Sequence, residues 1–126
     1  AMNDLVGLAY GWGHRPGDGS GRTDCFQLVC EVRDRLGLPS YREQFEWVYA
    51  DWTEEAFPRS MIARWLCEHG TRLKAPRRGA VVLLPAGAGA ALGTHLGGPV
   101  LFIGPGQNVI QAPLPDGVGH YFWMDR

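Results

Sequence analysis

The chain has 126 residues, 45% hydrophobic and 20% charged, and its 13 acidic and 12 basic side chains give a formal net charge of −1. This length makes one domain with a core that needs no disulfides, and it is too short for a two-domain cofactor enzyme. Nucleic acid and anionic membranes select a basic excess, so the near-neutral charge argues against both as the main partner. The 18 glycines and 9 prolines fall in short clusters between apolar runs, which indicates loops rather than disorder.

The termini and the cysteines favour a reducing compartment. The N-terminus lacks a basic region with an apolar stretch behind it, and no segment approaches the roughly 20 apolar residues that span a bilayer. We therefore expect synthesis in the cytoplasm without a signal peptide, and a domain cut from a longer chain would look the same. Cys25, Cys30 and Cys67 are odd in number and unequally spaced, which fits neither a disulfide framework nor a zinc site.

The first half of the chain is expected to be helical after an irregular start. Residues 5–12 predict a short helix or turn, and residues 13–23, with four glycines and one proline, predict a loop. Apolar residues then recur at helical spacing and predict a helix over about 25–36. Asp24 suits the N-cap of this helix, and Gln27 stands where it would close a capping box.

The second half changes from helices to short apolar strands. Two further helices are predicted over 43–52 and 59–69. Strands are predicted over 80–84, 100–103 and 109–112, with 120–124 as a further candidate strand and an Ala/Gly loop over 85–93. Helices followed by an antiparallel sheet predict an α+β fold in a single domain over residues 1–126.

Cys25 has the position of a nucleophile. It follows the glycine-rich loop and stands directly after the N-cap, in the first turn of the predicted helix. The positive end of the helix dipole and the unpaired N–H groups there favour a thiolate, and they can also hold the oxyanion of a tetrahedral intermediate. The alternative is that Cys25 is a small buried hydrophobe, which is what we expect of the two other cysteines.

A nucleophilic thiol needs a base, and four histidines are available. His14 in the loop and His69 near a helix end are expected to be surface or capping residues, and His120 has no assigned role. His95 follows the Ala/Gly loop at the end of a strand, where its ring is aimed rigidly. It is the candidate base, with a structural role as the alternative. Gln111 is a polar residue in an apolar strand and is the candidate partner that orients the base.

Several motifs occur in a defined order along the chain. They are Tyr10–Gly13, a glycine-rich loop, Asp24-Cys25 at the head of a helix, Pro76 to Gly79 before a strand, His95-Leu-Gly, and Val109 to Pro113. This order resembles the NlpC/P60 family of cysteine peptidases over about residues 5–113. The resemblance implies a papain-like α+β fold, with N-terminal helices packed on a C-terminal antiparallel sheet.

The resemblance also implies a role for each matching residue. Cys25 would be the nucleophile, His95 the general base and Gln111 the third polar residue. Tyr10 would help at the oxyanion or substrate site, and Asp24 would help to hold the substrate peptide. The implied reaction is hydrolysis of amide bonds in peptidoglycan stem peptides, typically between the γ-carboxyl of D-glutamate and diaminopimelate. No metal or organic cofactor is implied.

Two departures from the family pattern concern the site. Phe26 follows the cysteine where the family usually has a small residue, and its ring either narrows the substrate site or turns into the core. If the hairpin folds about residues 105–106, Gln111 lies opposite about Val100, too far along the strand from the candidate base. A bulge at Gly97-Gly98-Pro99 would restore the register; otherwise Gln107 or a water takes the third position.

Two rival functions stay open. One is a catalytically inactive module that binds the cell wall or plugs a tail or secretion apparatus, which Phe26 favours. The other keeps the thiol chemistry but carries out acyl transfer. The aromatic stretch 41–52 is expected to pack helices, with a wall of the substrate cleft as the alternative. The expected partners are stem peptides, together with a phage-tail, secretion-system or immunity protein, and delivery by a phage tail or secretion system would bring the chain to the wall.

Overall fold

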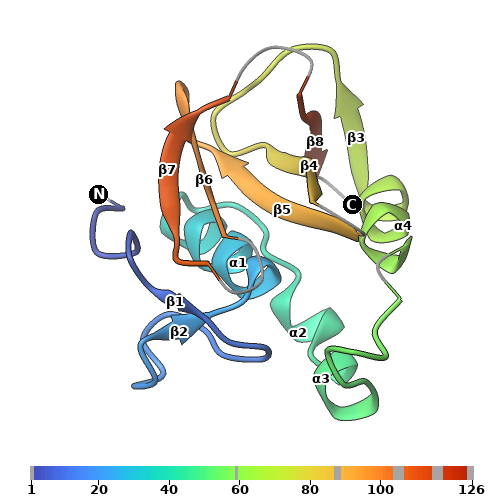
Figure 1. Ribbon diagram of the computed structural model, residues 1–126. Helices are drawn as coiled ribbons and strands as arrows, with labels where there is room; N and C mark the ends of the chain where they lie inside the picture. The colour runs from blue at the N-terminus through green and yellow to red at the C-terminus, as the bar shows by residue number, and fades with distance from the viewer. Residues whose placement is uncertain (1, 59, 87–88, 104–106, 115–117, 125–126) are drawn as a thin grey trace.

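The computed structural model describes residues 2–58, 60–86, 89–103, 107–114 and 118–124, and within them it contains both helices and an antiparallel sheet (Figure 1). The helices are α1 (Cys25–Arg35), α2 (Arg42–Phe45), α3 (Trp47–Asp51) and α4 (Ser60–His69). The strands are β1 (Ala9–Tyr10), β2 (Arg22–Thr23), β3 (Gly70–Leu73), β4 (Val81–Ala86), β5 (Gly89–His95), β6 (Pro99–Phe102), β7 (Ile110–Pro113) and β8 (His120–Met124). The papain-like assignment of this arrangement stays a prediction.

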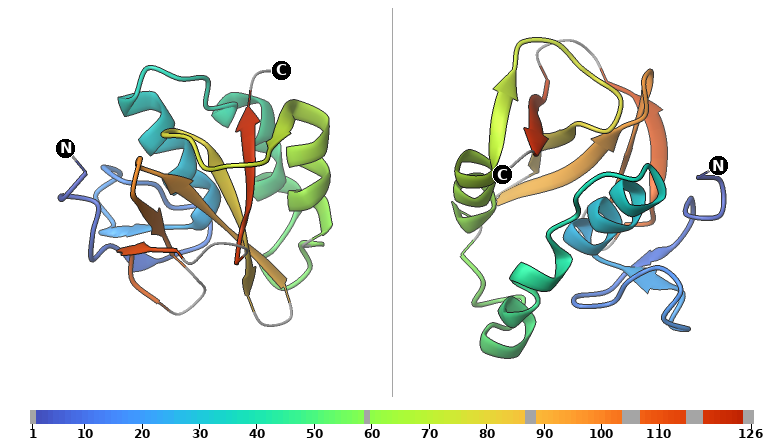
Figure 2. Two further views of the ribbon diagram at one scale, coloured as in Figure 1. Left: turned by 90° about the horizontal axis from the view of Figure 1, so that it is seen from above. Right: turned by 180° about the vertical axis from the view of Figure 1, so that it is seen from behind.

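Six strands form one sheet in the order β3-β8-β4-β5-β6-β7, and every neighbouring pair is antiparallel. Helices α1 and α4 pack on one face of this sheet, and α2 and α3 lie between them beyond one end of it (Figures 1 and 2). One apolar cluster joins Val29 of α1 and Trp65 of α4 to Val81 of β4. A second joins Leu28 of α1 to Leu101 of β6.

The opposite face of the sheet carries its own apolar cluster, which is built around Val82, Val100 and Tyr121. Each of these residues is adjacent in its strand to a residue that faces the helices, as Val82 is to Val81. Since successive side chains in a strand point to opposite faces, the two clusters lie on the two sides of the sheet. The sheet therefore has a helical side, which holds α1, and a far side.

The N-terminal segment is tied to both the loop and the sheet. β1 pairs in parallel with β2 at the end of the glycine-rich loop, so residues 5–12 form turns and a short strand rather than a helix. The backbone N–H of Tyr10 donates to the carbonyl of Gln107 at 3.1 Å, and that of Gly7 donates to Val109 at 2.9 Å. These bonds fix Tyr10 between the start of α1 and the β7 end of the sheet.

Most predicted elements form near their expected positions, but the loop predicted over 85–93 is wrong. Strand β4 continues to Ala86, and β5 occupies Gly89–His95. The small residues of β5 fit a close approach between strands. A Cβ at Gly93 would lie 2.9 Å from the side chain of Val100 and 3.0 Å from the carbonyl oxygen of Leu101. The glycines that suggested a loop are thus compatible with a tightly packed strand.

Two smaller differences concern one helix and one strand. The helix predicted over 43–52 forms as α2 and α3, which meet at Glu46. Strand β3, directly after α4, was not predicted, because its four residues show no apolar alternation. Position 59, at the predicted start of the last helix, lies outside the described residues.

The part of the chain that is described contains no helix long and apolar enough to cross a membrane.

Arg33 of α1 ties the helix to two distant segments from a position that is only 1% exposed. Its guanidinium donates to the carbonyl oxygens of Pro39 at 2.6 Å, Met124 at 3.0 Å and Gly79. It also lies 5.4 Å from the ring centroid of Trp123. Burial lowers the pKa of this guanidinium, and the three carbonyls replace the water that the group has lost. The C-terminal half of α1 is thereby held against the start of β4 and the end of β8.

Candidate active site

Helix α1 begins at Cys25, and Asp24 is its N-cap, as predicted. One carboxylate oxygen of Asp24 accepts from the backbone N–H of Gln27 at 2.8 Å, and the other accepts from that of Gly13 at 2.9 Å. The carboxylate is also hydrogen-bonded to the hydroxyl of Tyr49. Asp24 therefore joins the glycine-rich loop, the start of α1 and helix α3 at one point.

The second half of the predicted capping box does not form. The side-chain oxygen of Gln27 accepts from Nε of Arg42 at 2.9 Å, so Gln27 ties α1 to α2. The backbone N–H of Asp24 donates instead to the carbonyl of His14 at 3.2 Å. Asp24 itself is only 2% exposed, and this burial raises the pKa of its carboxyl, against the opposing effect of the hydrogen bonds it accepts.

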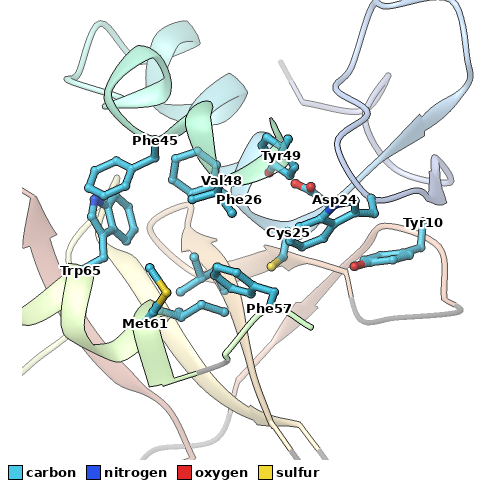
Figure 3. A pocket seen from close by; sticks show the side chains of 13 residues that line it. Tyr10, Asp24, Cys25, Phe26, Phe45, Val48, Tyr49, Phe57, Met61 and Trp65 are labelled. Atoms are coloured by element: carbon cyan, nitrogen blue, oxygen red, sulfur yellow. The ribbon is translucent and has the colours of Figure 1, made fainter. Parts of the chain in front are cut away.

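Cys25 lies on the wall of an apolar pocket between α1, α3 and α4 (Figure 3). Its chain neighbours Asp24 and Phe26 also line this pocket, and Leu92 of β5 adds an aliphatic wall. The remaining lining side chains are aromatic or aliphatic and come from four segments: Tyr10, Trp12, Phe45, Val48, Tyr49, Phe57, Met61, Ile62 and Trp65. We call this cavity the Cys25 pocket.

The ring of Phe26 both packs into the core and lines the pocket, so both alternatives considered for it apply. Its ring packs edge-on against Phe45 at 6.1 Å and Trp65 at 5.3 Å between ring centroids, and it also lines the Cys25 pocket. The aromatic stretch after α1 likewise serves both purposes, because Phe45 and Tyr49 line the pocket while they pack the helices. Trp12 and Phe57, whose ring centroids lie 5.4 Å apart, also form walls of the pocket, and the sequence did not predict this role for them. No local spacing in the sequence connects these residues to Cys25.

Tyr10 lies at the mouth of the pocket, and its hydroxyl points toward Cys25 (Figure 3). The phenol is hydrogen-bonded to the carboxylate of Glu54. Burial, followed by this neighbouring carboxylate, raises the pKa of Tyr10 well above its ordinary value. The phenol is therefore protonated at neutral pH, and its O–H donates to Glu54.

The structure does not bring His95 to Cys25. The residue before it, Thr94, pairs with Val81 and Leu101 and so faces the helical side of the sheet. His95 faces the far side, where its ring meets that of Tyr121 at 6.0 Å between centroids. The expected pairing of nucleophile and base on one face is thus contradicted by the register of β5.

The side chain of His95 instead stabilises the turn between β5 and β6. Gly97 N–H donates to Nδ1 of His95 at 3.0 Å, which leaves the ring proton on Nε2. Burial lowers the pKa of the imidazole and favours this neutral form. The N–H of Leu96 donates to the carbonyl of Pro99 at 2.9 Å, so Gly97 and Gly98 form a two-residue turn between these two positions, with Gly97 at φ +99°. The bulge predicted at these residues is therefore a hairpin turn.

Gln111 is not among the described residues that line the Cys25 pocket. It pairs with Leu101 and not with Val100, so it faces the helical side of the sheet, but its side chain is exposed on β7. The residue that aligns with His95 across β6 is Ala112. Gln107, the alternative third residue, is exposed too, and its described contact is the backbone bond to Tyr10. Of the five predicted site residues, the structure brings together Tyr10, Asp24 and Cys25.

The other histidines have partners of their own. His14 pairs with Asp18 at 3.1 Å in the exposed loop. The ring of His69 contacts that of Phe45 at 5.3 Å, and His120 lies 2.7 Å from a guanidinium nitrogen of Arg72. Histidine is not among the described residues that line the Cys25 pocket. Within the same described residues, no group of His, Cys, Asp and Glu side chains is arranged to hold a metal ion.

Replacing His95 by alanine is expected to leave the reaction of Cys25 with acyl donors within about twofold of wild type, since the ring lies on the far side of the sheet. The same change should lower the free energy of unfolding by about 1 kcal/mol, because the Gly97 N–H loses its acceptor. Acylation kinetics followed by mass spectrometry, alongside urea unfolding, measure both effects. A fall in acylation of a hundredfold without unfolding would place His95 in the reaction.

Comparison with protein-family models, with curated proteins and with solved structures found no match to this chain. A thiol at the first position of a helix, a protonated phenol and an apolar cavity lie side by side. This combination suits covalent attack on the carbonyl group of a bound acyl compound.

Proposed function

We propose that this protein is a cysteine hydrolase that cleaves peptide amide bonds through an acyl-enzyme on Cys25, with bacterial peptidoglycan stem peptides as its substrates. The observation that carries the proposal is the position of Cys25 at the start of α1 on the wall of the pocket. The backbone N–H groups of Cys25 and Phe26 precede the first intrahelical bond, which runs from Leu28 to Asp24 at 3.0 Å. Donors at this end of a helix favour both a thiolate and an oxyanion.

The proposed reaction needs a proton donor for the departing amine. The thiolate of Cys25 attacks the carbonyl carbon, an S–C bond forms, and the C–N bond breaks as the hydroxyl of Tyr10 gives its proton to the nitrogen. Water then attacks the thioester, passes a proton back to the Tyr10 phenolate and releases the thiolate. Burial and, after it, the Glu54 carboxylate raise the pKa of Tyr10, so its phenolate is a strong base in the second step; in the first step its O–H exchanges Glu54 for the amine nitrogen.

The substrate class rests on the order of motifs that resembles NlpC/P60 peptidases, and the pocket beside Cys25 supports binding of a substrate side chain next to the thiol. Incubation of purified stem peptides with the protein tests this class. We expect fragments whose combined mass exceeds that of the substrate by one water. Fragments joined to an added amine in place of water would indicate acyl transfer, and intact peptides would contradict cleavage.

A second candidate function is a non-catalytic module that binds a peptide or a structural partner in the same pocket. Two observations favour it: His95 faces the far side of the sheet, and Phe26 occupies the position beside the thiol. Binding of a stem peptide without turnover, unchanged after alkylation of Cys25, is the outcome expected of such a module.

A further inference from the structure

The Cys25 pocket is almost entirely apolar, which bears on the substrate that it would accept. Among its described lining residues, Asp24 is the one carboxylate, and neither lysine nor arginine occurs. The oxygens of Asp24 already accept hydrogen bonds from Gln27, Gly13 and Tyr49. The other walls are aromatic rings and aliphatic chains. The pocket therefore offers dispersion contacts and no described cation for an anionic group.

A substrate residue with an acidic side chain would bind weakly in this apolar pocket. A carboxylate that enters an apolar cavity loses its hydration, and here it would also approach the buried carboxylate of Asp24. Because no cation among the described lining residues compensates for this lost hydration, binding of the ionised carboxylate in the pocket is unfavourable. An apolar side chain at the same place gains by leaving water.

The free space also limits the size of the group that fits. It amounts to about 80 Å³, against about 150 Å³ in a cavity that binds benzene. A methyl, isopropyl or isobutyl group matches the smaller space, and an aromatic ring exceeds it. Pocket size and pocket charge thus point to the same class of side chain.

We propose, on the basis of the function proposed above, that the residue on the acyl side of the scissile bond carries a small aliphatic side chain, which occupies the Cys25 pocket. Among the bonds of a stem peptide, this selects alanyl bonds over the glutamyl bond that the family resemblance implies. Met61, Phe57 and Leu92 are the proposed specificity-determining walls, because their side chains line the same pocket as Cys25; Figure 3 shows Met61 and Phe57 in it.

Thiophenyl esters of N-acetyl-alanine, N-acetyl-valine, N-acetyl-phenylalanine and N-acetyl-glutamate test this selectivity. Attack by the Cys25 thiolate forms the new S–C bond and breaks the bond to the thiophenyl sulfur, which leaves as the thiophenolate anion, so the step needs no proton donor in the protein. We expect release of thiophenol by wild type to be at least tenfold faster with alanine and valine than with glutamate or phenylalanine. Equal rates, or a faster glutamate ester, would overturn the inference about the pocket and leave the thiol chemistry standing.

A charge placed in the pocket gives the complementary test. Met61 lies in the first turn of α4 and is half-buried, so Met61→Lys brings an ammonium group to the apolar wall. We expect this variant to raise the rate with the glutamate ester about tenfold and to lower the rate with the valine ester. Met61→Gln is the matched control, polar without charge, and should not favour glutamate. Failure of Cys25 to be acylated by any ester in wild type would overturn the proposed function itself.

Discussion

Cys25→Ala is expected to lower the rate of stem-peptide cleavage by about 10³-fold or more, because the variant keeps the pocket but loses the atom that forms the acyl-enzyme. The fold should survive, since a small, half-buried side chain is replaced by a slightly smaller one. Product analysis by liquid chromatography and mass spectrometry measures the rate, and circular dichroism checks the fold.

Cys67→Ala is the matched control for this variant. Cys67 is exposed on α4 and does not line the Cys25 pocket, so its removal should leave cleavage unchanged. Cleavage that persists in Cys25→Ala, or that disappears equally in both variants, would contradict the assignment of Cys25 as nucleophile.

Arg33→Met is expected to cause the largest loss of stability. The change keeps an unbranched side chain of similar length but removes the donors to the carbonyls of Pro39, Gly79 and Met124. Buried acceptors without a partner are costly, and we expect the free energy of unfolding to fall by about 3–5 kcal/mol. Urea unfolding followed by tryptophan fluorescence measures the difference.

Arg64→Met provides the comparison on an exposed helix face. The Arg64 side chain is 77% exposed and pairs with Glu68 at 3.2 Å. Its removal should change the free energy of unfolding by less than about 0.5 kcal/mol. If the two arginine variants unfold at the same urea concentration, Arg33 is not the tie between α1 and the sheet that its contacts indicate.

The sequence predicts the elements that carry strong periodicity. Apolar spacing and a capping aspartate locate α1 to within one residue, and the apolar runs after residue 98 locate β6, β7 and β8. Strand β5 was missed because its residues are mainly alanine and glycine, which carry no alternation. Its formation depends on pairing with β4 and β6, which is a long-range contact that a local pattern does not contain.

The candidate site was predictable where one segment builds it, and Tyr10, from another segment, came from the order of motifs. Asp24 and Cys25 stand together at one helix start, so the sequence locates both. The prediction for His95 is wrong by one position in the strand. Thr94 faces α1, so the next residue, His95, faces the far side of the sheet. The aromatic pocket gathers Trp12, Phe57 and Trp65 from distant segments, and only the packing of α3 and α4 around α1 reveals it.

Alkylation of the wild-type protein by iodoacetamide at pH 6, followed by peptide mapping, tests the reactivity of Cys25 most directly. The two other cysteines serve as internal controls: Cys67 is exposed, Cys30 is buried, and burial raises the pKa of the Cys30 thiol to about 12. We expect Cys25 to be carbamidomethylated first, at least tenfold faster than Cys67, because its thiolate is favoured at the start of α1. Modification of Cys67 ahead of Cys25 would contradict the role of Cys25 as an activated nucleophile.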